Sequence, residues 1–99
     1  MNSTIKETED QEEALFVAIA SLQSAEEVRR FMTDLCTRKE LSEFTERWVI
    51  ARLLHRGDLS YRDISAMTGA STTTVGRVAR FLGQEEHHGY KLVLDRQKS

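Results

Sequence analysis

The chain has 99 residues, 39% of them apolar and 30% charged, and a formal net charge of −2 at pH 7. These values are typical of one small globular domain, which buries only a modest core when it stands alone. No apolar run approaches the roughly 20 residues of a membrane span, the acidic beginning is unlike a signal peptide, and the single cysteine, Cys36, excludes an internal disulfide. We therefore expect a cytoplasmic protein that makes no contact with a membrane.

Charge is distributed unevenly along the chain. Residues 1–13 hold one lysine and five carboxylates, whereas residues 52–80 hold five arginines and two aspartates. Contact with phosphate requires only a local basic face, so the acidic overall balance does not exclude it. Charge taken alone favours the simpler interpretation, a solvated face on a small helical protein.

The first half of the chain predicts three helices. Proline is absent and the first glycine is Gly57, and both facts favour helices. Residues 1–10 are expected to form a frayed acidic head, and residues 11–99 a single helical domain. Capping boxes that begin at Ser24 and Thr37 open the second and third helices. The three apolar stripes are Leu15, Phe16, Ile19, Ala20 and Leu22; Val28, Phe31, Met32 and Leu35; and Leu41, Phe44, Trp48, Ala51 and Leu54.

The second half predicts three shorter helices, which makes six in all and an all-α fold. Gly57 has the position of a glycine that ends a helix. A capping box at residues 60–63 opens a helix that stops near Gly69, and Ser71 caps the next one, which runs to about residue 82. The last helix is predicted over residues 85–97, with Tyr90, Val93 and Leu94 as its apolar side chains.

The two helices within residues 60–82 have the pattern of a helix-turn-helix. That motif joins two short helices at a steep angle through a tight turn that often contains glycine, and Gly69 stands where the turn is needed. The apolar residues expected at the contact between the two helices are Ile64, Ala70, Val75 and Val78.

An unusual run of β-branched residues, 72–75, begins the second of these helices. Each one costs roughly 0.5 kcal/mol of helix propensity relative to alanine. Short hydroxyl side chains let a helix lie deep in the major groove of DNA, where threonine can contact base edges, phosphates and thymine methyl groups. A strand is the alternative, but four residues between a cap and a helical continuation are too few to favour it. The run therefore predicts a helix that reads DNA.

No enzyme signature is present. The sequence lacks a P-loop, a G-x-S-x-G elbow and an H-E-x-x-H motif. His87 and His88 are adjacent, so on a helix they point about 100° apart and cannot share a metal ion. Cys36 and His55 lack a third group that would make them a nucleophile and base. We expect neither catalysis nor a metal site.

The segment LLHRGDLSYRDISAMTGASTTTVGRVARFL resembles the corresponding part of the Trp repressor family. It is closer to that family's bacterial Trp-repressor-like branch, YerC/YecD, as is the ending GYKLVLDR. The resemblance covers roughly residues 12–97. It implies an intertwined homodimer in which the N-terminal helices of each subunit wrap around the other, and from which each helix-turn-helix projects outward.

The resemblance also implies a position for an effector. The residues that match the family's L-tryptophan site are Thr37, Arg47 and Arg77. For Arg47, an ion pair with Glu43 or Glu46 is an equally good interpretation, and for Arg77 a phosphate contact outranks the ligand role. Val78 replaces a glycine of the repressor, and Phe81 replaces a serine. Because both changes fill space, we expect that L-tryptophan is not required and that no cofactor binds.

The sequence thus predicts a homodimeric transcriptional regulator, most simply a repressor, that binds double-stranded DNA. Arg62 and Arg80 are expected to contact phosphates, and Ser71 both to cap its helix and to contact the DNA backbone. The residues expected to read base edges or ordered water are Thr72, Thr73, Thr74 and Arg77. The alternative is an adaptor whose helix-turn-helix binds protein and not DNA.

Overall fold

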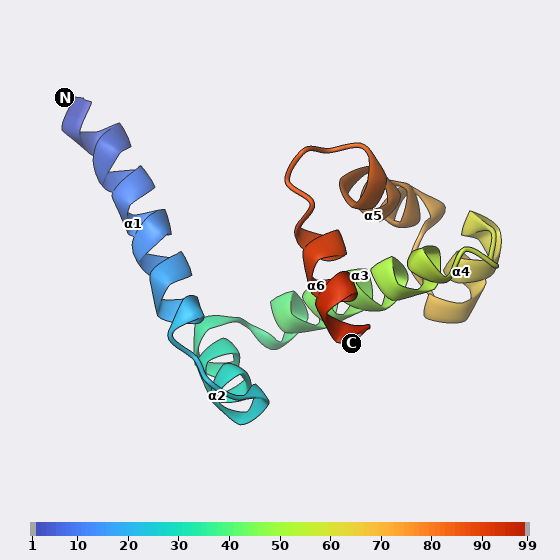
Figure 1. The fold of residues 1–99 in the computed structure, drawn as a ribbon, viewed down its shortest axis with the longest axis horizontal. Coiled ribbons are helices and arrows are strands. Elements are labelled where there is room, and N and C mark those ends of the chain that lie inside the picture. The colour runs from blue at the N-terminus through green and yellow to red at the C-terminus, as the bar shows by residue number, and fades with distance from the viewer. Residues whose placement is uncertain (1, 99) are drawn as a thin grey trace. The chain divides into compact units, whose positions relative to one another are not determined.

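The computed structural model describes residues 2–98, with side chains from residue 7 onward. Its helices are α1 (Asn2–Ala20), α2 (Ala25–Leu35), α3 (Arg38–Arg56), α4 (Tyr61–Thr68), α5 (Thr72–Gly83) and α6 (Gly89–Gln97) (Figure 1). The residues described include no strand, so the prediction of an all-α fold with six helices is confirmed. The chain divides between Arg38 and Lys39 into two compact units.

The first unit consists of α1 and α2. Helix α1 begins at Asn2 and so includes residues 2–10 of the acidic head, whose fraying stays a prediction. The head contains neither proline nor glycine, and its glutamates and lysine are good helix formers. These properties account for the continuous helix.

Helix α2 has the predicted N-terminal cap, with one difference. The Ser24 hydroxyl accepts a hydrogen bond from the backbone N–H of Glu27, at 3.1 Å. The Glu27 carboxylate accepts from the N–H of Gln23, one residue before the cap, at 2.8 Å. The reciprocal bond of a capping box is therefore displaced by one residue, and the helix still begins where it was predicted.

The second unit has one apolar core, formed where α3, α4 and α5 meet. Its fully buried side chains include Ile50, Ile64, Val75 and Val78. Ile50 lies outside the apolar stripe predicted for this helix, and it is buried because α3 packs over a wider arc than one line of residues. The buried cluster comprises Ile50, Ala51, Ile64, Ala70, Val75 and Val78, with Trp48, Leu53, Leu54, Leu59 and Tyr90 packed against it.

The turns around α4 depend on two glycines. Gly57 and Gly69 have φ values of 81° and 80°, in the left-handed region that glycine enters without a Cβ penalty. Between them, Asp58 accepts a hydrogen bond from Arg56 at 2.8 Å. This bond lowers the pKa of Asp58 from its ordinary value. The left-handed Gly57 and Gly69 end α3 and α4 at the positions that the sequence predicted.

Helix α6 begins at Gly89, four residues later than predicted. The backbone N–H groups of Gln84 and Glu85 both bond to the carbonyl of Arg80, at 2.8 and 3.0 Å, and so belong to the end of α5. His88 then takes a left-handed conformation, with φ of 55°. The predicted start at residue 85 was wrong because residues 84–88 form a connection that periodicity does not reveal.

Within residues 2–98, no helix is long and apolar enough to cross a membrane. The same residues include no group of three or more histidines, cysteines or carboxylates placed to hold a metal ion.

Candidate nucleic-acid interface

The beginning of α4 is fixed by a complete capping box. The Ser60 hydroxyl accepts from the N–H of Asp63 at 3.0 Å, and the Asp63 carboxylate accepts from the N–H of Ser60 at 3.1 Å. Two N–H groups that the helix leaves unpaired are thus satisfied within one turn. The sequence predicted both the box and the helix that follows it.

The turn between α4 and α5 is held by hydroxyl groups that the sequence analysis did not single out. Thr68 Oγ1 donates to the carbonyl of Ile64 at 2.7 Å and accepts from the N–H of Ala70 at 3.2 Å. Ser65 Oγ donates to the carbonyl of Ala70 at 2.5 Å. The signal was present, since serine and threonine beside a turn glycine often bond to the backbone. These bonds fix how α5 leaves α4.

The inner faces of α4 and α5 pack together through the predicted residues. Ile64, Val75 and Val78 have no exposed surface, and Ala70 is 6% exposed. Fully burying a valine contributes roughly 1.5–3 kcal/mol. The helix-turn-helix is therefore held by packing within this one chain.

The polar residues of α5 lie on its other side. Thr72, Thr73 and Arg77 are exposed, whereas Thr74 is half-buried. Thr73 and Arg77 are four residues apart, so their side chains share one face of the helix. Thr74 turns toward the cap, and its hydroxyl lies 3.1 Å from that of Ser71. Of the predicted base-reading threonines, the structure thus exposes two.

The two arginines predicted to contact phosphates are exposed. Arg62 lies in the first turn of α4. Arg80 lies near the end of α5, where its Nε is 3.9 Å from a carboxylate oxygen of Glu85, a weak pair between exposed side chains. A phosphate can therefore compete with Glu85 for the Arg80 guanidinium.

Substitutions of Ser71 can distinguish its two predicted roles, capping α5 and contacting the DNA backbone. Its hydroxyl accepts from the N–H of Thr74 at 3.1 Å and caps α5. Ser71→Ala is expected to lower the free energy of unfolding by about 1 kcal/mol, whereas Ser71→Asp keeps the cap. Ser71→Asp also adds a negative charge to the predicted DNA-facing end. Ser71→Asp should therefore leave urea unfolding nearly unchanged and weaken duplex binding, and equal duplex affinity for Ser71→Asp and the unchanged chain would remove Ser71 from the interface.

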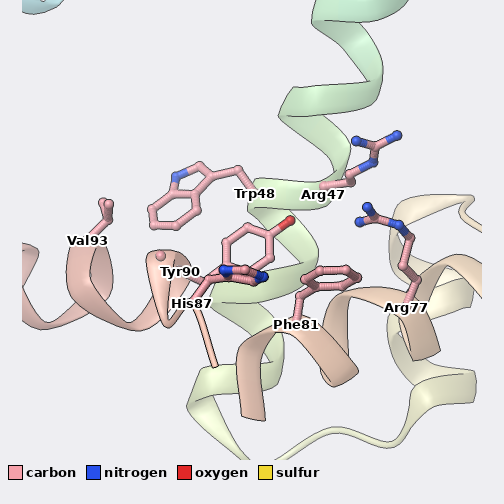
Figure 2. A pocket seen from close by; sticks show the side chains of 8 residues that line it. Arg47, Trp48, Arg77, Phe81, His87, Tyr90 and Val93 are labelled. Carbon is pink, nitrogen blue, oxygen red and sulfur yellow. The ribbon is translucent and has the colours of Figure 1, made fainter. Parts of the chain in front are cut away.

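A pocket of about 520 Å³ adjoins α5 on the side of α3 and α6 (Figure 2). Trp48 of α3 and Tyr90 of α6 stack along it, with ring centroids 6.4 Å apart and an interplanar angle of 21°. The basic side chains that reach it are those of Arg47, Arg77 and His87. The complete lining is Arg47, Trp48, Arg77, Phe81, His87, Gly89, Tyr90 and Val93.

The structure brings together two of the three residues expected to hold an effector. Arg47 and Arg77 both line the pocket, and Figure 2 shows their guanidinium groups near one another. Thr37 belongs to the first unit. Arg47 also makes the predicted alternative contact, with its Nη2 4.0 Å from a carboxylate oxygen of Glu43. The lining residue His87 was missed because it lies in the connection before α6.

Val78 and Phe81, the two residues expected to fill space in the effector site, lie in different parts of the structure. Val78 is fully buried in the core that joins α4 to α5, as predicted, and it does not line the pocket. Phe81 forms part of the pocket wall and leaves the volume beside it open, whereas the sequence predicted that it would crowd this space. Its side chain is only half-buried, so it covers one side of the pocket and does not fill it.

Comparison with known proteins places this geometry in a family. The family model described as Trp repressor protein matches residues 10–98. The uncharacterized protein YerC of Bacillus subtilis (strain 168) is 43% identical over 84 residues, which cover 85% of this chain and 79% of YerC.

Solved structures agree with this assignment. A TrpR-like protein from Eubacterium eligens ATCC 27750 superposes with a TM-score of 0.78 at 40% identity, covering 87% of each chain. A candidate Trp repressor from Staphylococcus aureus has a TM-score of 0.80 at 34% identity, covering 90% of this chain and 87% of that one. The chain therefore belongs to the Trp repressor family, and within it to the YerC-type Trp-repressor-like proteins.

Proposed function

We propose that this protein is a transcriptional regulator, acting as a repressor, that binds specific DNA sequences as a homodimer. The observation that carries the proposal is the division of α5 into two faces. Val75 and Val78 on one face are fully buried against the core, while Thr73 and Arg77 on the other are exposed. A helix held in this way can enter the major groove without losing its packing. Membership in a family of DNA-binding regulators supports the same function.

The exposed residues have distinct roles in this proposal. Arg62 and Arg80 contact phosphates, which position the protein on the duplex but carry no sequence information. Ser71 caps α5 and contacts the DNA backbone. Sequence is read by Thr72, Thr73 and Arg77 through base edges or ordered water, with Thr74 in a smaller part because its hydroxyl lies beside that of Ser71.

Exposed apolar side chains of the first unit support the homodimer. Phe16, Val17 and Leu35 are 57%, 60% and 49% exposed in the single chain. Large apolar side chains that remain exposed in a single chain are typical of a surface that another chain covers. Light scattering at micromolar concentration should return twice the mass of the chain, and the mass of one chain would contradict the homodimer.

Duplex binding at low salt distinguishes the proposed function from its alternative, a protein-binding adaptor. Fluorescence anisotropy with a pool of random-sequence duplexes should show binding at 50 mM salt, because phosphate contacts occur on any sequence. If the pool is not bound at any protein concentration up to the micromolar range, the adaptor becomes the better account.

Arg77→Ala is expected to weaken binding to operator DNA by about 1–3 kcal/mol, which corresponds to roughly 5–150-fold. The Arg77 side chain is exposed, so the free energy of unfolding should be nearly unchanged. Arg96→Ala is the matched control, since Arg96 is also exposed but lies in the last turn of α6. Equal operator affinities for the two variants in a gel-shift titration would remove Arg77 from the interface.

Operator binding is expected to proceed without L-tryptophan. Val78 already fills the contact between α4 and α5, so α5 is set in place by the chain itself. An effector shifts an equilibrium only when it binds one of two states more tightly than the other. Because α5 is already held on α4, L-tryptophan has little left to shift. Calorimetry and operator titrations with and without L-tryptophan test this point. Micromolar binding that raises operator affinity tenfold or more would contradict it.

A further inference from the structure

Phe81 lies against two arginines of the proposed interface at once. The guanidinium carbon of Arg77 is 4.5 Å from the centroid of its ring, and that of Arg80 is 5.1 Å from the same centroid. Both distances are within the range of a cation–π contact. Figure 2 shows the Phe81 ring extending from α5 beside the Arg77 side chain.

Packing of the core in the second unit does not account for the contact of one ring with two cations. The buried cluster is formed by other residues, and Phe81 is half-buried at its edge. Two guanidinium groups repel one another, and the negative face of an aromatic ring offsets part of that repulsion. The ring therefore contacts two like charges on the exposed part of α5.

An ordered arginine binds phosphate better than a mobile one. An exposed arginine side chain samples many rotamers, and it loses this freedom when it binds a phosphate. Contact with a fixed aromatic surface removes part of that freedom before binding, so less is lost in the complex. Arg77 and Arg80 are three residues apart and so lie on neighbouring positions of one helix surface.

We propose that Phe81 is a positioning residue, which holds the Arg77 and Arg80 guanidinium groups in the orientation that contacts DNA. The proposal rests on the proposed DNA-binding function. It adds to that interface a residue that touches no DNA itself and acts through the aromatic character of its ring.

The test compares Phe81→Leu with Phe81→Tyr. Leucine keeps an apolar side chain but has no aromatic face, whereas tyrosine keeps the face. Because the ring orders two arginine side chains before binding, we expect Phe81→Leu to lose about 5–30-fold in duplex affinity and Phe81→Tyr to stay within about twofold of the unchanged chain. Phe44→Leu is the matched control, since Arg47 lies 5.8 Å from the Phe44 ring on α3, and its duplex affinity should be unchanged.

Two further measurements separate positioning from a structural role. Thermal unfolding reports whether Phe81→Leu changes stability, and the Nε–H chemical shifts of Arg77 and Arg80 in the free protein report the ring's proximity. We expect those shifts to move in Phe81→Leu and to persist in Phe81→Tyr. If the unchanged chain binds duplexes and Phe81→Leu binds them equally well, this inference is wrong and the proposed function stands. If the unchanged chain binds no duplex, both fail.

Discussion

Val78→Gly is expected to lower the free energy of unfolding by roughly 2.5–4 kcal/mol. Val78 is fully buried between α4 and α5, so the substitution removes the roughly 1.5–3 kcal/mol of its burial and adds about 1 kcal/mol for glycine within a helix. This is a large share of the 5–15 kcal/mol that stabilises a typical domain. Urea unfolding followed by circular dichroism measures it, and operator affinity should fall because α5 is no longer held on α4.

Ala79→Gly is the control for the loss of the valine. It introduces glycine at the next position of the same helix, where the side chain is half-buried. Its expected cost is about 1 kcal/mol, the helix propensity term alone. If Val78→Gly costs no more than Ala79→Gly, Val78 does not join the two helices, and the argument for binding without L-tryptophan loses its physical basis.

Operator affinity is expected to fall roughly 150-fold when salt rises from 50 to 200 mM. Arg62 and Arg80 of two subunits provide four cationic groups for phosphates. Each phosphate that is neutralised releases condensed counterions, so the logarithm of the binding constant should fall with the logarithm of salt at a slope of about −3.6. Fluorescence anisotropy over this range measures the slope.

Single substitutions show how much each arginine contributes to the slope of the salt dependence. Arg62→Ala removes one cation from each subunit and should reduce the slope by about 2, while leaving discrimination between operator and unrelated duplex unchanged. Arg96→Ala should leave the slope as it is. A slope near zero for the unchanged chain would mean that arginine–phosphate contacts do not drive binding.

The helix-turn-helix could be predicted from sequence because its signals are local. The capping box at Ser60, the left-handed Gly69 and the buried Ile64 and Val75 lie within sixteen residues. Caps and turn glycines depend on neighbouring backbone, so their spacing alone identifies them. The family resemblance rested on the same stretch and was confirmed.

The pocket could be predicted only in part, because its walls come from distant segments. Arg47 and Arg77 were identified through the family resemblance, and no spacing rule joins α3 to α5. His87 was missed because the connection before α6 was taken for helix, and hydrogen bonds to the Arg80 carbonyl end α5 there instead. The burial of Ile50 likewise depends on how α3 packs, which a single stripe of residues does not specify.

Selection of bound duplexes from a random library tests the central claim most directly. The unchanged protein, without added amino acids, should enrich a pseudo-palindrome whose half-sites lie about 34 Å apart, because each subunit of a two-fold homodimer presents one α5 to successive turns of the major groove. Arg77→Ala should enrich the same spacing with relaxed preference within each half-site. Recovery of a pool no different from the starting library, at a salt concentration where the protein is folded and dimeric, would contradict the account.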